Sequence, residues 1–311
     1  MTKLRKGLEE YLAVRRALGF RLDAPGRLLH QFIDFAEAER ASFITRDLAL
    51  RWATQSKKCQ PAYWASRLSV VRRLAEYHSV IDPRTEIPPV GLLPHRLQKK
   101  SPYVYSDMEI EQLIAAAKRL RSPLELQGAT YSTLLGLLAV TGMRVSEPLS
   151  LDREDVDLAE GLLTIRQTKF GKSRLIPVHA STRDVLVHYA AQRDRTLPSL
   201  ATAAFFVSEQ GRRLSQSTVW RTFVKFSRET GLRSATSSTG PRIHDLRHGF
   251  TIRTLCRLYR AGEDVERHMT ALATYLGHSN PVNTYWYLSA TPELLLLAST
   301  RLDCRTREAT R

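Results

Sequence analysis

Prolines gather in one short stretch of this chain and divide it into two parts. Five of its 14 prolines lie between Ile81 and Pro102. Proline lacks an amide donor and disfavours helix in the residue before it, so no continuous helix crosses this stretch. We therefore expect a Pro-rich basic linker over residues 81–102, between a first domain at 1–80 and a second at 103–311. The length of 311 residues agrees with about two domains.

Before the linker, apolar residues recur at three- and four-residue steps, which is the spacing of amphipathic helices. The periodic segments are 4–18, followed by Gly19 as a candidate C-cap, 28–36, a stretch after Thr45, and 62–78. Four short helices can bury one small core. We expect the first domain to be all-helical.

Positive charge is the strongest signal in the composition. The chain has 47 Lys and Arg residues against 31 Asp and Glu, a net charge of +16, and the first 100 residues carry +9 of it. Such a surface attracts polyanions, nucleic acid ahead of an acidic membrane, although a basic soluble enzyme can have the same balance. No apolar run approaches the roughly 20 residues that span a bilayer. The cysteines, Cys59, Cys256 and Cys304, are scattered and suit a reducing interior, so we expect a soluble cytoplasmic protein.

The second domain combines helical and strand-like patterns. Its expected elements are a helix capped by Ser106 and Glu109, a buried helix at 131–140 ending at Gly142, strands at 162–167, 174–178 and 205–207, and helices at 216–230, 244–260 and 266–276. The first two strands flank a short turn containing Gly171, which indicates a hairpin. The chain lacks βαβ alternation, which favours a mainly α fold with a small antiparallel β-sheet (α+β) over a parallel nucleotide-binding sheet.

Two basic residues stand at the ends of these elements. Arg144 comes just after Gly142, and Glu147 would share its face in a helical turn and fix the guanidinium. Lys169 lies in the hairpin turn, where a lysine is either solvated or a mobile proton donor. Each feature alone is common on protein surfaces.

A third cluster is the run His244-Asp245-Leu246-Arg247-His248, which places two imidazoles and a guanidinium on one helical face. Two histidines at this spacing can bind zinc, but a guanidinium beside the metal opposes cation binding, and no HExxH glutamate is present. The same groups suit an anion such as phosphate. We expect no metal and no cofactor.

A fourth cluster follows near the end of the chain. Leu276-Gly277-His278 precedes the run Thr284-Tyr285-Trp286-Tyr287-Leu288. Aromatic residues this dense belong more often to a core than to a reaction centre. The run by itself therefore identifies no chemistry.

Taken in order, the four clusters resemble the tyrosine recombinase (phage integrase) family. The shared pattern is Arg144, a hairpin lysine at 169, the H-x-x-R-H run at 244–248, and Leu-Gly-His at 276–278 with Tyr287 nine residues after that histidine. The resemblance covers essentially all of the second domain, and the helical first domain resembles the family's clamp-like, core-binding domain. Residues 284–294 look most like the transposon-encoded members.

The resemblance implies a site-specific recombinase that cleaves and rejoins DNA without metal or ATP, for integration, excision or transposition of a mobile element. Tyr287 would attack a scissile phosphate and hold the DNA as a 3′-phosphotyrosine, while Tyr285 would be a structural aromatic. Arg144 and Arg247 would grip the non-bridging oxygens and neutralise charge in the transition state.

The resemblance also implies helpers for these three residues. Lys169 would protonate the leaving 5′-hydroxyl, and His278 would add a hydrogen bond. His244 would help accept the tyrosine proton or orient the phosphate. Glu147 would orient Arg144, and His248 would be secondary.

Other basic residues are expected to hold the DNA backbone, which makes binding dependent on salt. They are Arg67, Arg72, Arg73, Arg96, Lys99, Lys100, Arg221 and Lys225. The implied partner is double-stranded DNA, bound by a dimer at each site and a tetramer in synapsis, and accessory recombination proteins are compatible with this scheme. The apolar part of the tail 292–311 either docks on a neighbouring subunit or packs on its own core.

Two other functions fit the same residues. A type IB topoisomerase-like enzyme shares the chemistry and would relax supercoiled DNA without paired sites. A non-catalytic DNA-binding protein of the same fold would have no need of Tyr287.

Overall fold

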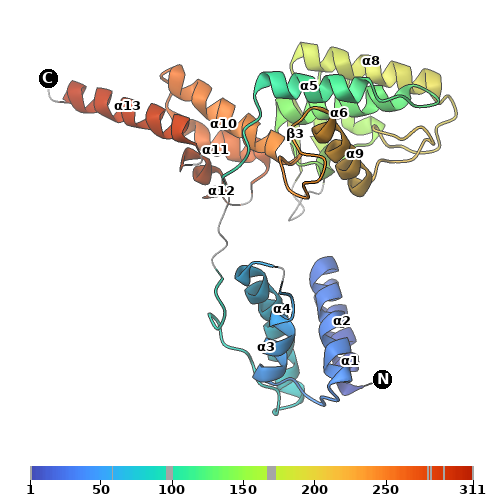
Figure 1. Ribbon diagram of the computed structural model, residues 1–311, viewed down its shortest axis with the longest axis vertical. Helices are drawn as coiled ribbons and strands as arrows, with labels where there is room; N and C mark the ends of the chain where they lie inside the picture. The colour runs from blue at the N-terminus through green and yellow to red at the C-terminus, as the bar shows by residue number, and fades with distance from the viewer. Residues whose placement is uncertain are drawn as a thin grey trace. The chain divides into compact units, whose positions relative to one another are not determined.

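In the computed structural model the chain divides into two compact units, Met1–Lys100 and Ser101–Arg311 (Figure 1). The structure describes residues 2–57, 59–95, 101–166, 173–278, 280, 282–289 and 291–309, with the backbone alone for 303–309. The division between the units falls within the Pro-rich stretch.

The first unit is all-helical, as predicted. Its helices are α1 (Lys3–Ala17), α2 (Asp23–Ala38), α3 (Arg46–Thr54) and α4 (Pro61–Ile81). The Thr45 hydroxyl caps α3 by accepting from the amide of Leu48 at 3.1 Å. Gly19 follows α1 with φ +87°, a conformation that favours glycine. The core is built around Phe32 and Trp52, whose rings meet edge to face with centroids 5.3 Å apart.

The chain beyond α4 packs on this unit over much of the Pro-rich stretch. The amide of Glu86 donates to the carbonyl of Ile44 at 2.8 Å, and Leu93 packs against the core. Arg72 donates to the carbonyls of Pro88 and Pro89 at 2.6 and 2.8 Å. Residues 82–93 therefore contribute to the fold of the first unit, and Arg72 is engaged in holding them there.

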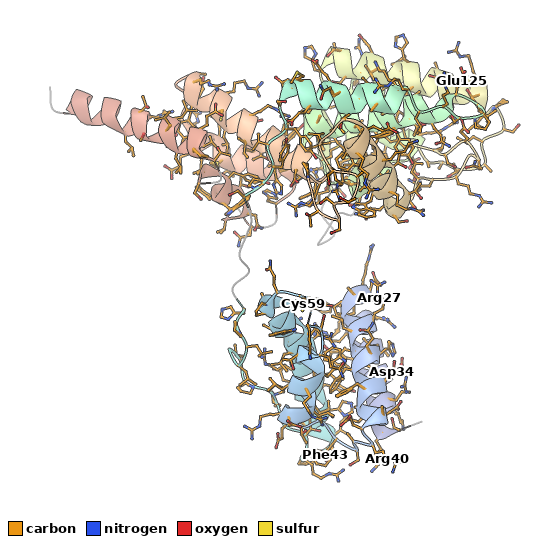
Figure 2. All side chains as sticks on the ribbon, viewed as in Figure 1. Arg27, Asp34, Arg40, Phe43, Cys59 and Glu125 are labelled. Carbon is orange, nitrogen blue, oxygen red and sulfur yellow. The ribbon has the colours of Figure 1, made fainter. Side chains whose placement is uncertain are left out.

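Arg67 is buried, so its predicted place on a DNA-facing surface is wrong. Its Nη2 donates to the carbonyl of Trp52 at 2.9 Å, and its Cζ lies 3.9 Å from the centroid of a Trp52 ring. Helical periodicity places a Cα on a face, but it does not say that a long side chain folds back over a neighbouring aromatic ring. Arg73 is exposed, as expected, and so is Arg27 on α2 (Figure 2).

The second unit contains nine α-helices, two 3₁₀ helices and a three-stranded sheet within its described residues. They are α5 (Asp107–Lys118), α6 (Leu126–Thr141), α7 (Ser146–Ser150), η1 (Arg153–Asp155), β1 (Val156–Asp157), β2 (Leu162–Ile165), β3 (Arg174–Pro177), α8 (Ala180–Thr196), α9 (Gln216–Glu229), α10 (Asp245–Arg260), α11 (Val265–Leu276), α12 (Val282–Tyr285), η2 (Trp286–Ser289) and α13 (Pro292–Ala309). The predicted fold class, mainly α with a small antiparallel sheet, is confirmed. The capping box of Ser106 and Glu109 at the start of α5 is present.

The sheet has the order β1-β2-β3, and all its pairs are antiparallel. The predicted hairpin is β2 with β3, in a register that pairs Leu162 with Pro177 and Ile165 with Arg174. The strand predicted at 205–207 is wrong, since only isolated bridges occur there, at Ala204 and Val207. These residues reach the core as single side chains of an irregular loop rather than as a ladder.

Several elements lie outside the sequence predictions, and the longest of these within 101–278 is α8. The inner face of α8 carries Leu186 and Tyr189, but Val185 and Val187 are exposed on its outer face. Because apolar residues lie on both faces, the sequence of α8 lacks a clear helical periodicity.

Helix α6 packs at the centre of the unit and is buried on nearly all sides, as its apolar sequence indicates. In the described part of the chain, no helix is both long and apolar enough to cross a membrane.

Candidate active site

The way in which α6 ends determines where the following residues of the site lie. Gly142 caps the helix with φ +61°, and a Cβ at this position would lie 2.4 Å from Cδ1 of Phe250. A side chain is therefore excluded both by conformation and by space. The tight exit brings Arg144 and the short helix α7 directly after the buried helix.

Arg144 is fixed by a carboxylate and a carbonyl. Its Nη1 donates to Oε1 of Glu147 at 2.9 Å, and its Nη2 donates to the carbonyl of Gly277 at 2.7 Å. Its backbone amide donates to Oε2 of Glu147 at 2.8 Å. Glu147 thus orients Arg144, at the spacing expected from the sequence, while 27% of the Arg144 side chain stays exposed.

Arg247, on α10, is a buried residue that binds the same segment of the chain as Arg144, at residues 276–277. It is only 2% exposed, and its Nη1 and Nη2 donate to the carbonyls of Gly142 and Leu276 at 2.8 and 2.7 Å. Burial, reinforced by the charge of Arg144, lowers the pKa of Arg247 to about 10, so it stays charged at neutral pH. Residues more than 100 positions apart therefore place two guanidinium groups at one point.

The histidine that contacts Tyr287 is His248. By the resemblance, His244 helps to accept the tyrosine proton or orients the phosphate. The Tyr287 hydroxyl lies 2.7 Å from Nδ1 of His248. Burial and the nearby His244 lower the pKa of His248 to about 4, so its imidazole is neutral and can accept the tyrosine proton. His244 is exposed and meets the His248 ring edge-on, with centroids 4.9 Å apart. The i, i+4 spacing places both rings on one face, but only packing decides which one meets the tyrosine.

Tyr287 and Tyr285 occupy different environments. Tyr287 is 3% exposed and packs with Ile252 and Leu294, whereas Tyr285 is 42% exposed. Burial raises the pKa of Tyr287, and the charge of Arg247 acts in the opposite direction. The tyrosine at the family spacing is the one that lies within the cluster.

His278 follows the left-handed Gly277 at the end of α11. Its Nδ1 lies 2.6 Å from the hydroxyl of Thr284, and burial with the charges of Arg247 and Arg144 lowers its pKa to about 4. A neutral imidazole that accepts at Nδ1 carries its proton on Nε2 and can donate one hydrogen bond from there.

Several predicted residues fall outside the described part of the chain. They are Lys169, Arg96, Lys99 and Lys100. Among the described residues, no group of three or more His, Cys, Asp or Glu is arranged to hold a metal.

Helix α9 presents the basic face that its sequence indicates. Arg221 and Lys225 are exposed, and Phe223 and Phe226 are buried on the opposite side. Trp220 is also largely exposed on this helix. The arrangement offers positive charge with an aromatic side chain to a partner outside the unit.

The sequence reasoning missed Arg174 at the start of β3. Arg174 donates to both carboxylate oxygens of Glu147, at 3.0 and 2.7 Å. A signal was present, because strand alternation places Arg174 on the same face as the buried Ile176, while Leu175 between them is exposed. A charged residue at an inward position of a strand needs a buried partner.

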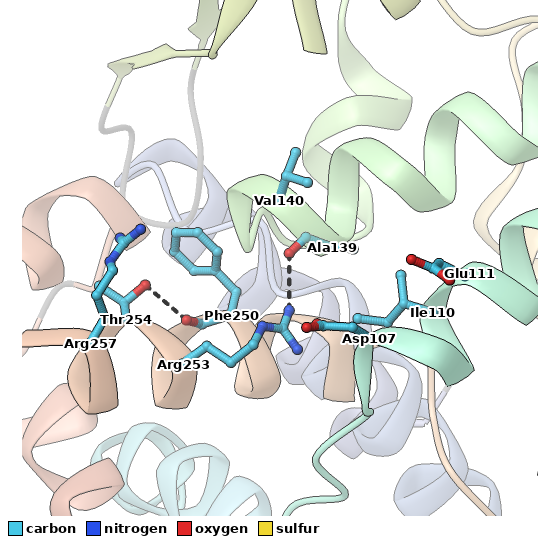
Figure 3. A pocket seen from close by; sticks show the side chains of 9 residues that line it. All are labelled: Asp107, Ile110, Glu111, Ala139, Val140, Phe250, Arg253, Thr254 and Arg257. Carbon is cyan, nitrogen blue, oxygen red and sulfur yellow. Dashed lines mark hydrogen bonds between the residues drawn. The ribbon is translucent and has the colours of Figure 1, made fainter. Parts of the chain in front are cut away.

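A cavity of about 420 Å³ lies between α5, the end of α6 and α10. Figure 3 shows its lining, in which Arg253 donates to the carbonyl of Ala139 at 3.4 Å and Phe250 stands beside the end of α6. None of the predicted catalytic residues lines it, although Phe250 connects it to the site by packing over Gly142.

Comparison with known proteins identifies relatives of the whole chain. The model of the phage integrase family matches residues 104–293. A Sinorhizobium fredii protein named as an integrase/recombinase, y4rB, is 45% identical over 314 residues, which cover 100% of both chains.

Two solved structures share the fold. The Tn1549 transposon integrase in complex with transposon right-end DNA superposes with a TM-score of 0.64 at 16% identity, covering 97% of this chain and 100% of that one. A lambda integrase tetramer bound to a Holliday junction gives a TM-score of 0.57 at 20% identity, covering 89% of this chain and 78% of that one.

Proposed function

This chain belongs to the phage integrase family, whose members are DNA strand transferases, and on that premise we propose a reaction scheme for its site. The oxygen of Tyr287 attacks a scissile phosphate, the bond to the 5′-oxygen breaks, and the DNA is held as a 3′-phosphotyrosine. Attack by a 5′-hydroxyl on that linkage reverses the step and rejoins the strand, so the phosphodiester energy is conserved.

The observation that carries this scheme is the contact of 2.7 Å between the Tyr287 hydroxyl and Nδ1 of His248. A tyrosine with a raised pKa needs a base to become a nucleophile, and a neutral imidazole is one. The proton passes to His248, with His244 as a supporting residue on the outer side. Lys169, by the family resemblance, protonates the leaving 5′-oxygen.

The two arginines supply the electrostatic part. The charges of Arg247 and Arg144 act on this tyrosine. Each guanidinium has five N–H groups, so those not engaged within the chain can donate to a phosphate. Such preorganised donors stabilise the charge that develops on the non-bridging oxygens. His278 donates a further hydrogen bond to the phosphate.

Covalent trapping on nicked DNA tests this scheme. A suicide substrate that loses the 5′-fragment after cleavage accumulates the protein–DNA adduct, and peptide mapping identifies the attached residue. We expect the adduct on Tyr287, its loss in Tyr287→Phe with DNA binding retained, and its persistence in Tyr285→Phe. An adduct that survives in Tyr287→Phe and disappears in Tyr285→Phe would reverse the assignment.

The same preparation separates the alternative functions. Relaxation of a plasmid that lacks any specific site indicates a topoisomerase-like enzyme. Absence of any covalent species indicates a binding protein that shares the fold.

We further propose that the protein acts on double-stranded DNA as an oligomer and moves a mobile element. The similarity to y4rB and to the transposon integrase supports the mobile element, and the lambda integrase tetramer on a Holliday junction supports assembly. A dimer at each site and a tetramer of paired sites would supply four tyrosines for two duplexes. Accessory recombination proteins are also compatible with this scheme.

The C-terminal helix bears on assembly. In α13, Leu294 is buried against the unit's own core, whereas Leu295 and Leu296 are exposed. The helix thus packs on its own chain and leaves an apolar edge for a neighbour. Replacing Leu295 and Leu296 by Ala should weaken assembly on paired sites, measured by gel shift, and leave binding to a single site unchanged. Unaltered pairing in this variant would exclude that edge.

A further inference from the structure

Arg174 touches several parts of the site at once. Its Nη1 and Nη2 hold the two oxygens of Glu147, and its Nε donates to the carbonyl of Tyr275 at 2.8 Å. The side chain is only 10% exposed. All three guanidinium nitrogens of Arg174 therefore donate to groups of this chain.

Three arginines cap three successive carbonyls at the end of α11. Arg174 donates to Tyr275, Arg247 to Leu276 and Arg144 to Gly277. The last carbonyls of a helix lack partners within the helix and carry the negative end of its dipole. This helix end therefore holds the three guanidinium groups in a fixed order, with His278 next along the chain.

Glu147 lies between two of these arginines and is 4% exposed. Burial favours its neutral form, but the hydrogen bonds and charge of Arg174, followed by those of Arg144, hold the pKa of Glu147 below its usual range. Arg174 is thus the main partner of the carboxylate. Glu147 thus divides its hydrogen bonds between two arginines, and the Arg144 side chain stays 27% exposed.

We propose that Arg174 is a positioning residue for phosphate binding, one that engages Glu147 and the end of α11 so that Arg144 meets the scissile phosphate with its geometry and charge intact. This inference rests on the proposed function of the site. It assigns Arg174 no contact with DNA. Its effect passes through Glu147 and Arg144.

The backbone at Gly277 makes room for this arrangement. A Cβ there would lie 2.7 Å from Nη1 of Arg174, and the residue has φ +69°. Glycine is therefore needed for the conformation and for the close approach of the guanidinium. The Leu-Gly-His motif thus accommodates Arg174 as well as leading to His278.

The experiment compares two substrates that differ in one charge. The first is a nicked suicide substrate with an ordinary scissile phosphodiester, and the second carries a methylphosphonate there, which has one negative oxygen fewer. Single-turnover adduct formation is measured for Arg174→Gln, which loses the charge, and for Arg174→Lys, which keeps it without the fork. Arg166→Gln is the matched control, because Arg166 adjoins β2 of the same hairpin and pairs with the carboxylate of Asp155, while its own side chain is exposed.

We expect Arg174→Gln to lose about 100-fold in cleavage rate on the phosphodiester, with DNA binding within about threefold of the parent chain. On the methylphosphonate the loss should shrink to less than about tenfold, because less charge needs to be neutralised. Arg174→Lys should lose about tenfold on the phosphodiester, and Arg166→Gln should match the parent chain on both substrates.

An equal loss on both substrates would overturn the proposal, and so would a full cleavage rate in both Arg174 variants. If Arg174→Gln does not fold, judged by circular dichroism, the substrate comparison with Arg174→Lys decides in its place. Adduct formation by the parent chain distinguishes failure of the proposed function from failure of the Arg174 proposal. If the parent chain forms no adduct the proposed function fails, whereas an adduct that is indifferent to Arg174 removes this inference alone.

Discussion

Arginines in both units donate to backbone carbonyls, but their surroundings differ, and so do the roles that we infer for them. In the first unit, Arg67 and Arg72 bind the carbonyls of Trp52, Pro88 and Pro89 and so join a helix to its neighbours. In the second unit, Arg144 and Arg247 bind carbonyls beside a buried carboxylate and a tyrosine. The bond is the same in both places. A candidate reaction centre results only where several guanidinium groups converge and the side chain of one of them, Arg144, stays partly exposed.

The largest effect should come from removing a converging arginine. Arg247→Ala is expected to slow single-turnover cleavage by about 10²–10³-fold, because a preorganised donor to the developing charge is lost. Arg72→Ala, which removes a carbonyl-binding arginine from the first unit, should leave the rate of bound complexes unchanged. A similar loss of rate in both variants would mean that the two sets of arginines do not differ in function.

The buried arginine of the first unit should matter for folding instead. Arg67→Met removes a hydrogen bond from a charged donor and a cation–π contact, and we expect it to lower the free energy of unfolding by about 1–3 kcal/mol. Urea denaturation followed by tryptophan fluorescence measures the change, with Arg73→Met as the exposed control. Weaker DNA binding by a fully stable Arg67→Met chain would instead restore Arg67 to the DNA-contacting set.

Acid should destabilise both units through histidines that the fold keeps neutral. His248 and His278 have pKa values of about 4 in the folded chain against an ordinary 6.5, so the unfolded chain binds more protons between these values. Their contribution to stability is complete above pH 6.5 and is lost progressively as the pH falls towards 4. Burial lowers the pKa of His78 in the first unit in the same direction.

Denaturation at pH 7, 6 and 5 checks this expectation. The double variant His248→Gln, His278→Gln should show a shallower loss of stability on acidification than the parent chain. A pH dependence identical to that of the parent would mean that neither histidine is held neutral by the fold.

The smallest effect concerns single exposed charges. Arg73→Ala in the first unit and Lys225→Ala on α9 should each lower the slope of log affinity against log salt by about 1, with cleavage of bound substrate unchanged. Titration of DNA binding at several salt concentrations measures the slope. An unchanged slope removes that residue from the DNA-contacting surface.

Much of the site was predictable because its motifs are local. Gly142 with Arg144 and Glu147, the run at 244–248, and Tyr287 after His278 are each short patterns in a fixed order. The family resemblance depends only on that order. Arg174 escaped because its partners, Glu147 and Tyr275, lie far from it in sequence and its strand is only four residues long.

The sequence by itself determined the helical first unit, the mainly α second unit with its hairpin, the family, and the tyrosine at the right spacing. Periodicity, caps and motif order depend on residues that are close together in the sequence, so they can be recognised without the structure. Only the tertiary structure decided that Arg67 is buried, that His248 rather than His244 meets Tyr287, and that three arginines share the end of α11. Those outcomes depend on which carbonyls and rings of distant segments the long side chains contact. Tertiary packing decides these contacts, and the spacing of residues in the sequence does not.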